Sequence, residues 1–329
     1  RFTLTALLNP GRDVKLAESR IKGYKSFTNK IWNAANFLLI NKCEFERNLN
    51  ISSIKFPLNQ WIINELSTTS QKIEKYMSKY LFHEVANEIY HFIWHTYCDW
   101  YIEFAKTLFN EISDDSKETK KVAIWIFIQI LKMAHPIMPF ITEQLWGIIN
   151  GEKEFLMNQV FEDHNIINQF KKSQSNIINL TQIISAVRNI RSELNISYKN
   201  LIDINFSNNK PDFIIFLNGY ENELKRLLKL NKISFDLKTR KTLEAAYIVV
   251  ADTTITVPLK NIVDTGKEIK KLYEKKDKEL NNLININSKL SNSSFLKKAP
   301  KEIIEQFNKQ ANEIKSSIEK IDQIIDTIN

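Results

Sequence analysis

The sequence predicts a mainly α-helical protein with a small α+β module and a C-terminal helical hairpin. Apolar residues recur at three- and four-residue steps through most of the chain, and only 6 Gly and 7 Pro occur among 329 residues. Short β-branched runs interrupt this pattern once. We therefore expect a helical-bundle domain over 1–155, an α+β junction domain over 156–259 and an antiparallel coiled-coil hairpin over 260–329.

A long helix ending near residue 41 is predicted to have two different faces. Its apolar stripe consists of Ile21, Tyr24, Phe27, Ile31, Ala34, Ala35 and Leu38. A second face carries Lys22, Ser26, Lys30, Asn33 and Phe37. A cation, an amide and an aromatic ring are what single-stranded RNA contacts require. A solvated face with Phe37 packed on a neighbouring helix explains the same pattern, so both interpretations remain open.

Further bundle helices follow from the same periodicity and from turn signals. We expect them at 1–8, 60–80, 82–109, 117–134 and 140–149. Short connections favour an antiparallel arrangement of these helices.

The very aromatic helix at 82–109 contains a metal-like pattern, because His91, His95 and Cys98 lie at i, i+4 and i+7. A zinc site needs a fourth ligand, and none is evident, so we predict no metal. Asp99, beside Trp100 and Tyr101, is interpreted as an acceptor for a ring donor. As a lone carboxylate it is a weak candidate for catalysis.

The junction domain is predicted to begin with a helix at 165–194. Its apolar stripe leaves Arg188 and Arg191 on the opposite side. The expected elements after it are a strand at 201–206, a helix at 212–230, a strand at 232–236, and a hairpin formed by 245–250 and 254–259.

The C-terminal segment shows the regular spacing of a coiled-coil seam. The apolar positions are Ile304, Phe307, Ala311, Ile314, Ile318, Ile321, Ile325 and Ile328. A less regular stripe precedes it, and the polar stretch 291–300 separates the two. We expect an antiparallel hairpin about 40 Å long.

Charge and cysteine content narrow the functional classes. The formal net charge is +8, with ten basic against four acidic residues in 1–60, nine against fifteen in 61–163, and thirteen against seven in 164–250. Two basic segments favour an anionic partner such as nucleic acid.

Two cysteines allow no disulfide framework, which fits a reducing cytoplasm. No apolar run approaches a membrane span, so no membrane partner is expected.

Several blocks of the sequence resemble the valyl-tRNA synthetase family, in the order in which that family presents them. They are Gly11–Leu16, Asn29–Phe37, Phe92–Glu103, His135–Trp146, Ala186–Glu193 and Phe295–Pro300. Isoleucyl and leucyl enzymes share some of these blocks. The tail favours valine, because an isoleucyl enzyme would often end in a cysteine-rich zinc module and this tail has no cysteine.

The resemblance implies the C-terminal part of an enzyme that joins valine to tRNA(Val) using ATP with Mg²⁺. It implies an anticodon-binding domain, a junction domain and an arm that leans on the outer corner of tRNA. The catalytic and editing domains would lie before Arg1, and we expect a truncated start. The nucleotide-binding signatures His-Ile-Gly-His and Lys-Met-Ser-Lys-Ser do not occur here. No catalytic residue, no cofactor and a monomer are therefore expected for this stretch.

Site residues come partly from the resemblance and partly from charge. The family places an aromatic residue that faces an anticodon base at Phe37, and an apolar residue lining the same pocket at Ile102. Charge and geometry add Arg12, Lys15, Arg20, Lys30 and Asn33. On the arm, Asn285 and Gln310 stand where family members often have arginine. The weaker substitutes near the tip are Lys289, Lys297, Lys298 and Lys301.

Two alternatives remain open. One is a fragment of an isoleucyl-like synthetase. The other is a non-enzymatic coiled-coil interaction protein, which would show no dependence on anticodon sequence and little loss of RNA binding at raised salt.

Overall fold

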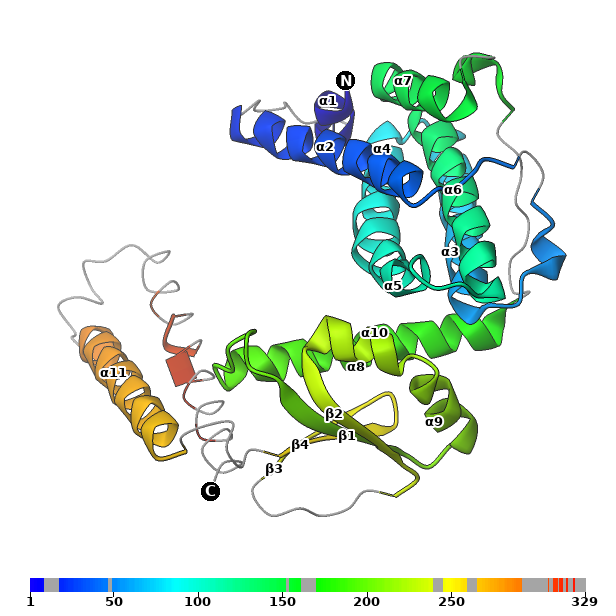
Figure 1. Ribbon diagram of the computed structural model, residues 1–329. Helices are drawn as coiled ribbons and strands as arrows, with labels where there is room; N and C mark the ends of the chain where they lie inside the picture. Colours follow the sequence, from blue (N-terminus) through cyan, green and yellow to red (C-terminus); the bar gives the residue numbers. More distant parts are fainter. Residues whose placement is uncertain are drawn as a thin grey trace. The chain divides into compact units, whose positions relative to one another are not determined.

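The computed structural model consists of two compact units, residues 1–181 and 182–329 (Figure 1). The described residues are 1–8, 18–46, 49–151, 154–160, 170–238, 245–258 and 265–291, with separate positions between 307 and 322. The predicted class is confirmed: the protein is mainly α, with one four-stranded sheet among the described residues.

The first unit is a helical bundle whose helices begin and end close to the predicted positions. Its elements are α1 (Phe2–Leu7), α2 (Glu18–Ile40), η1 (Ile51–Ser53), α3 (Pro57–Met77), α4 (Phe82–His91), η2 (Phe92–Tyr101), α5 (Ile102–Leu108), α6 (Asp114–Ala134), α7 (Pro139–Asn150) and η3 (Leu156–Asn158). The predicted apolar stripe of α2 is buried at Phe27, Ile31, Ala34, Ala35 and Leu38. Its first two positions differ: Ile21 is 45% exposed and Tyr24 is half-buried, so the prediction was wrong at the start of the helix.

Helix α6 forms the core of the bundle. Ser113 caps it by accepting a hydrogen bond of 3.1 Å from the backbone N–H of Ser116, and Asp114 and Asp115 occupy its first turn. Acidic residues are favourable there because the N-terminal end of a helix dipole is positive. Every residue from Val122 to Leu131 is buried. A helix that is apolar on all sides must be surrounded by other elements.

A carboxylate from α6 also fixes the start of α3. Glu118 accepts hydrogen bonds of 3.0 Å from the backbone N–H groups of Lys55 and Phe56, and one of 2.9 Å from the Asn59 side chain. Pro57 occupies the first turn, where its missing N–H is not needed. These bonds join two helices that lie far apart in sequence.

The predicted helix at 82–109 is continuous, but its middle part has a different hydrogen-bonding pattern. Residues 92–101 form a π-helix, η2, between the α-helical segments α4 and α5. Buried residues follow in adjacent pairs at 92–93, 97–98 and 101–102. These pairs repeat every four to five residues, which is wider than the 3.6-residue period of an α-helix. We call α4, η2 and α5 together the aromatic rod.

The second unit contains the predicted α+β module. Helix α8 (Lys171–Glu193) spans the boundary between the units, and β1 (Ile202–Asn208), α9 (Pro211–Asn218), α10 (Glu221–Leu228), β2 (Leu230–Asp236), β3 (Ala245–Val250) and β4 (Thr253–Pro258) follow. The strand order is β2-β1-β4-β3, with β1 and β2 parallel and the other pairs antiparallel. The predicted hairpin turn is made by Ala251 and Asp252, both at positive φ.

Two local predictions for this unit were wrong. The helix expected at 212–230 is divided into α9 and α10 around Gly219 and Tyr220, because Tyr220 has the non-helical angles φ −108° and ψ 22°. Arg191 does not lie on a solvent-facing side of α8; it is 4% exposed and bonded to backbone carbonyls.

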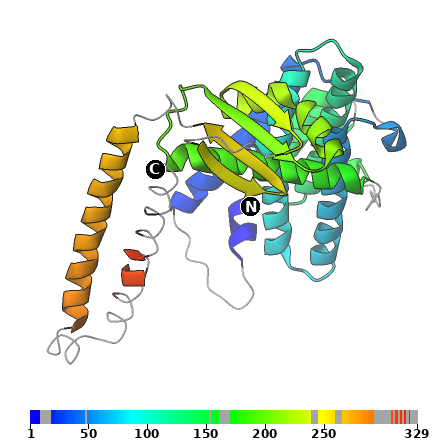
Figure 2. The ribbon, with the colours of Figure 1, turned by 90° about the horizontal axis from the view of Figure 1, so that it is seen from below.

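The first half of the predicted arm is the helix α11 (Thr265–Ser291), seen as a long straight helix in Figure 2. Lys276 on this helix forms an ion pair with Asp322. The two residues are equally distant in sequence from position 299, at the end of the predicted break, as an antiparallel hairpin requires. Half of the eight predicted seam positions are described: Ala311 is buried, and Phe307, Ile314 and Ile318 are half-buried. The other four lie outside the described residues.

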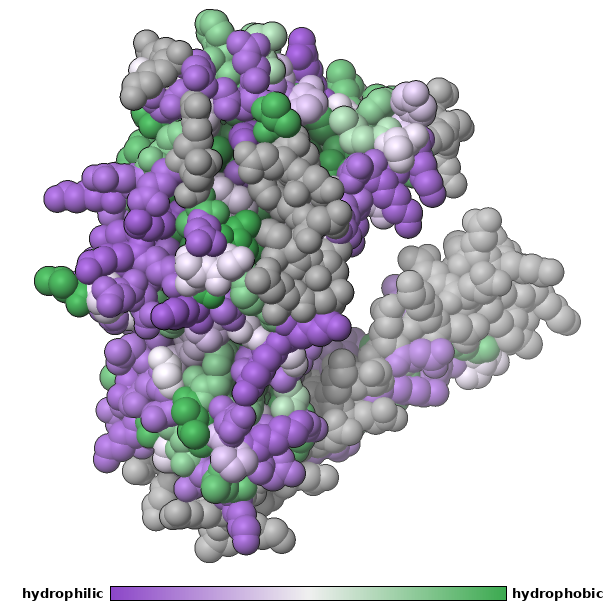
Figure 3. Space-filling view, turned by 90° about the vertical axis from the view of Figure 1, so that its right-hand side faces the viewer, coloured by the Kyte–Doolittle hydropathy of each residue, from purple (hydrophilic) through white to green (hydrophobic). Residues whose placement is uncertain are grey.

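The surface of the described residues is predominantly polar. On the face shown in Figure 3, hydrophilic residues cover most of the coloured area and hydrophobic residues form small, separate groups. None of the described helices combines the length and the apolar character needed to cross a membrane.

Candidate nucleic-acid interface

Helix α2 packs on the aromatic rod and its end through its buried stripe and through part of the predicted RNA-contacting face. Phe27 of α2 packs on Tyr90 and Trp94, with ring centroids 4.9 and 6.3 Å apart. Further along α2, Phe37 packs on Phe109, which follows the rod, with a centroid distance of 5.7 Å. Contacts therefore advance in the same direction along both elements, and α2 lies parallel to the rod.

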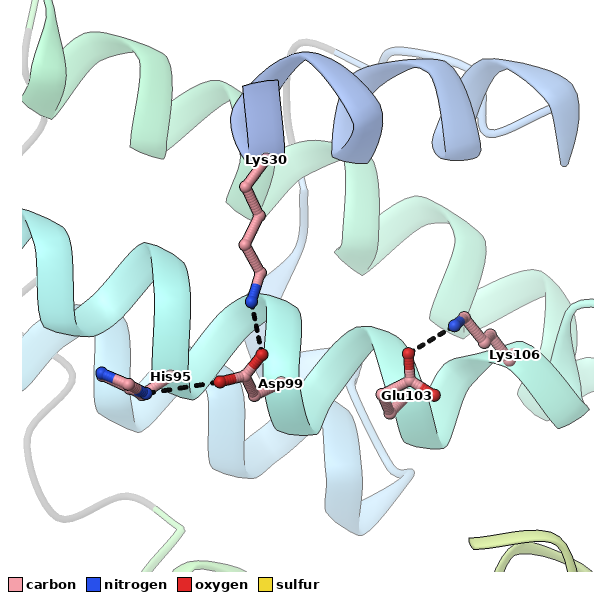
Figure 4. A network of polar contacts seen from close by, with 5 residues as sticks. All are labelled: Lys30, His95, Asp99, Glu103 and Lys106. Atoms are coloured by element: carbon pink, nitrogen blue, oxygen red, sulfur yellow. Dashed lines mark hydrogen bonds and ion pairs between the residues drawn. The ribbon is translucent and has the colours of Figure 1, made fainter. Parts of the chain in front are cut away.

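Phe37 is half-buried at the end of this seam. The ammonium group of Lys106 lies 5.8 Å from the centre of its ring. Lys106 itself is paired with Glu103 one turn earlier on α5 (Figure 4). The ring thus lies among a second aromatic ring, a cation and a carboxylate, surroundings that suit both stacking and hydrogen bonding to a base.

Ile102 begins α5 and is 6% exposed. On the rod it lies between Asp99, which contacts α2, and Lys106, which contacts Phe37. Ile102 therefore lies on the part of the rod whose neighbouring residues contact α2 at Lys30 and Phe37. Its predicted role in an anticodon pocket stays a prediction, because its side chain is almost fully covered.

Lys30 contributes to a polar network that sequence reasoning did not foresee. Its ammonium group forms an ion pair with Asp99, and Asp99 also lies 3.3 Å from Nδ1 of His95 (Figure 4). The same ammonium group lies 4.0 Å from the centre of the Trp94 ring. Asp99 therefore serves a cation and an imidazole, and the prediction that it accepts a bond from an aromatic side chain finds no support in its contacts.

The structure describes some of the remaining predicted site residues and not others. Arg20 and Asn33 are exposed on α2. Arg12 and Lys15 lie outside the described residues, as do the arm residues Lys297, Lys298 and Lys301 and the side chain of Lys289. Contacts of these side chains with RNA stay predictions.

Neither a metal site nor an activated nucleophile is found among the described residues. No group of three or more metal-binding side chains comes together there. His91 and His95 are exposed with ring centroids 5.4 Å apart, whereas Cys98 is buried on another side of the rod. Burial raises the pKa of both Cys43 and Cys98 to about 12, which makes thiolate formation at neutral pH negligible.

Comparison with protein families identifies the class of domain to which this interface belongs. Residues 59–205 match the family described as the anticodon-binding domain of tRNA ligases. Residues 264–329 match the family described as the valyl-tRNA synthetase tRNA binding arm. A helical bundle with an anticodon-binding sequence, followed by such an arm, places the chain among the aminoacyl-tRNA synthetases.

Curated relatives specify the family further. A valine–tRNA ligase of Pelagibacter ubique is 35% identical over 330 residues, which cover 98% of this chain and 37% of the relative. That of Aquifex aeolicus is 33% identical over 339 residues, 99% of this chain and 29% of the relative. That of Legionella pneumophila is 32% identical over 314 residues, 92% and 34% of the two chains.

The chain belongs to the valyl-tRNA synthetase family. It spans about a third of the length of the curated relatives that it matches. The match to the valyl arm favours this assignment over the isoleucyl-like alternative.

Proposed function

We propose that this chain is the tRNA-binding part of a synthetase that charges tRNA(Val) with valine. The observation that carries the proposal is the seam between α2 and the aromatic rod. There, a half-buried aromatic ring and exposed polar groups of α2 occur together with a cation of α5. The aromatic rod on one side of this seam lies within residues 59–205, which an anticodon-binding family matches, whereas α2 precedes the matched residues.

In this proposal the seam binds the anticodon loop, with one base stacked beside Phe37. Asn33 lies one turn before Phe37 on the exposed side of α2, where its amide can bond to a base edge. Arg20 lies further along the same helix and supplies a cation for the RNA backbone. Base contacts of this kind specify the sequence, while phosphate contacts position the RNA.

The arm is proposed to support the outer corner of the tRNA. Catalytic and editing domains in the same whole protein would use ATP with Mg²⁺ and correct misacylated tRNA. The part described here would place the acceptor end correctly, because misplacement of a substrate by about 1 Å can cost roughly 10²-fold in rate. We further propose a monomer, the three-part division at 155 and 259, and a cytoplasmic location.

Titration with two RNAs tests this function. The chain is titrated with tRNA(Val) and with the same tRNA carrying a changed anticodon, and both titrations are repeated with Phe37→Ala. We expect tighter binding of the native anticodon, and a loss of affinity for it of about 10-fold in the variant, since stacking of one base contributes about 1–3 kcal/mol. The preference between the two tRNAs should fall as well, because the stacked base is then no longer held beside the groups that read it.

A matched control is Phe140→Ala, because Phe140 is an aromatic residue of α7 that is 82% exposed. It should leave the preference unchanged. Equal binding of both tRNAs by the unaltered chain would show that the seam does not read the anticodon. Absence of any tRNA binding would favour the interaction-protein alternative.

A further inference from the structure

A small pocket lies at the end of α8, in the second unit. It has a volume of about 210 Å³, and its lining consists of Arg188, Arg191, Ser192, Ile196, Tyr198 and the Leu227–Leu228 pair. Two guanidinium groups and one aromatic ring thus surround an apolar floor. No carboxylate is among these lining residues.

Arg191 is the least exposed charged side chain in this lining, at 4%. Its Nη1 donates to the carbonyl of Leu228 at 3.3 Å, and its Nη2 donates to the carbonyls of Ser197 and Asn200 at 2.8 and 2.7 Å. Its Nε–H has no hydrogen-bond partner among the described residues. All three acceptors are neutral, so these bonds orient the guanidinium group without cancelling its charge.

A second group of contacts brings another cation to the rim. Tyr198 is 58% exposed, and its hydroxyl donates to the carbonyl of Leu227 at 3.3 Å. Its ring centre lies 5.9 Å from Cζ of Arg191 and 5.7 Å from Nζ of Lys229, which follows α10. The ring therefore lies close to two positive charges, and Arg188 adds a third on the pocket wall.

An anion is the ligand that such a site favours. Removing positive charge from water is costly unless a counter-ion or hydrogen bonds replace the water, and burial lowers the pKa of Arg191 accordingly. Glu223 is buried one turn before Leu227 on α10, but it is not part of the lining. Arginine suits phosphate in particular, because the planar guanidinium fork matches two phosphate oxygens.

We propose that this pocket binds a phosphate group, and that its source is the sugar–phosphate backbone of the bound tRNA. The pocket is smaller than the roughly 300–1,000 Å³ typical of drug-sized ligands, which suits one phosphate with part of its sugar. The RNA source rests on the proposed function, whereas phosphate binding itself does not. The site adds a backbone contact in the junction module to those proposed for the seam and the arm.

The test combines a small probe with tRNA and uses the full chain. Inorganic phosphate is titrated while the Nε–H resonance of Arg191 is followed by NMR, in the unaltered chain and in Arg188→Gln. Arg188 is exposed and can be replaced without opening the core. We expect a saturable shift that weakens at least 5-fold in Arg188→Gln and recovers in part in Arg188→Lys.

The second part of the test measures tRNA affinity as a function of salt concentration. Arg188→Gln should reduce the slope of log affinity against log salt concentration by about one, since one phosphate contact is lost. Lys232→Gln removes the same charge from an exposed position on β2 and is the matched control; it should not change the phosphate titration.

The outcomes distinguish the RNA backbone from free phosphate as the source of the bound group. Phosphate binding with an unchanged tRNA slope would assign the site to free phosphate and overturn the RNA source. The phosphate site would be overturned if Arg188→Gln and Lys232→Gln had equal effects in the phosphate titration and in the salt dependence of tRNA binding. It would also be overturned if phosphate caused no saturable shift. If the chain bound phosphate but no tRNA at all, the proposed function would fail while the phosphate site remained.

Discussion

Lys30 shows how one side chain can be paired within the protein and still lie at the proposed RNA-binding face. Its side chain is 24% exposed, and its charge is shared between the Asp99 carboxylate and the Trp94 ring. Ion pairs of partly exposed groups contribute little to stability, about 0–1 kcal/mol. An RNA phosphate can therefore compete for this ammonium group at small cost, and the pair can orient Lys30 before RNA arrives.

The two buried thiols lead to a prediction about alkaline pH. Burial raises the pKa of Cys43 and Cys98 to about 12 in the folded chain, from an ordinary value near 9. Above pH 9 the unfolded chain therefore releases protons that the folded chain retains. The free energy of unfolding should be unaffected by these thiols below pH 9 and should fall as the pH rises towards 12, by up to about 1.4 kcal/mol per pH unit for each.

Urea unfolding at pH 8 and pH 10.5, under reducing conditions, measures this effect. Cys98→Ala should show a smaller loss between the two pH values than the unaltered chain, by up to about 2 kcal/mol. The same loss in both proteins would show that the thiol does not cause the alkaline sensitivity.

At the scale of elements, Glu118 is the residue whose replacement should disturb a helix junction most directly. Lys55 and Phe56 donate to different oxygens of the Glu118 carboxylate. Glu118→Gln replaces one of these oxygens by an NH₂ group, which would face one of the two backbone N–H groups and could not accept its hydrogen bond. Carboxylate bonds to backbone N–H groups at a helix start are charge-assisted, so we expect a loss of about 1–3 kcal/mol in unfolding free energy.

Glu74→Gln is the matched control for this prediction, because Glu74 is exposed on α3. Its effect should remain within about 0.5 kcal/mol. Urea unfolding of the three proteins decides the question, and equal stabilities of Glu118→Gln and Glu74→Gln would contradict the proposed role of the carboxylate.

Elements with a long periodic pattern could be predicted from the sequence, and those that depend on distant partners could not. The stripe of α2 from Phe27 to Leu38 and the Ala251–Asp252 hairpin were confirmed, since both depend on local spacing and turn chemistry. The π-helical segment was missed because its paired buried positions were assigned an α-helical period. The Lys30–Asp99 contact joins residues 69 positions apart, and no local pattern specifies it.

The same limit applies to Arg191. Its place in the sequence, on the side of α8 opposite the apolar stripe, predicted exposure. The loop at 194–200 and the end of α10 instead cover it and supply carbonyl acceptors. The sequence of α8 alone does not predict the burial of Arg191, because the residues that cover it come from other elements.

At the scale of the whole molecule, the contributions of charge and of base recognition to tRNA affinity should be separable by varying the salt concentration. The chain carries a net charge of +8. If about three phosphates are neutralised, tRNA affinity should fall about 40-fold between 50 and 200 mM salt, as counter-ion release requires. A changed anticodon should lower affinity at every salt concentration without changing this slope, because base contacts release few ions. A slope that changed with the anticodon would show that the two kinds of contact are not independent.

The π-helical segment also limits how this part of the chain can change in length. Deleting one residue from 92–101 while the remaining residues keep their bonding would rotate everything after it by one residue step, up to about 100° around the helix axis. Ile102 and Lys106 would then leave the side of the rod that meets α2. Substitutions in η2 leave this geometry intact, whereas an insertion or deletion does not, so we expect homologous chains to differ here in residue type far more than in residue number.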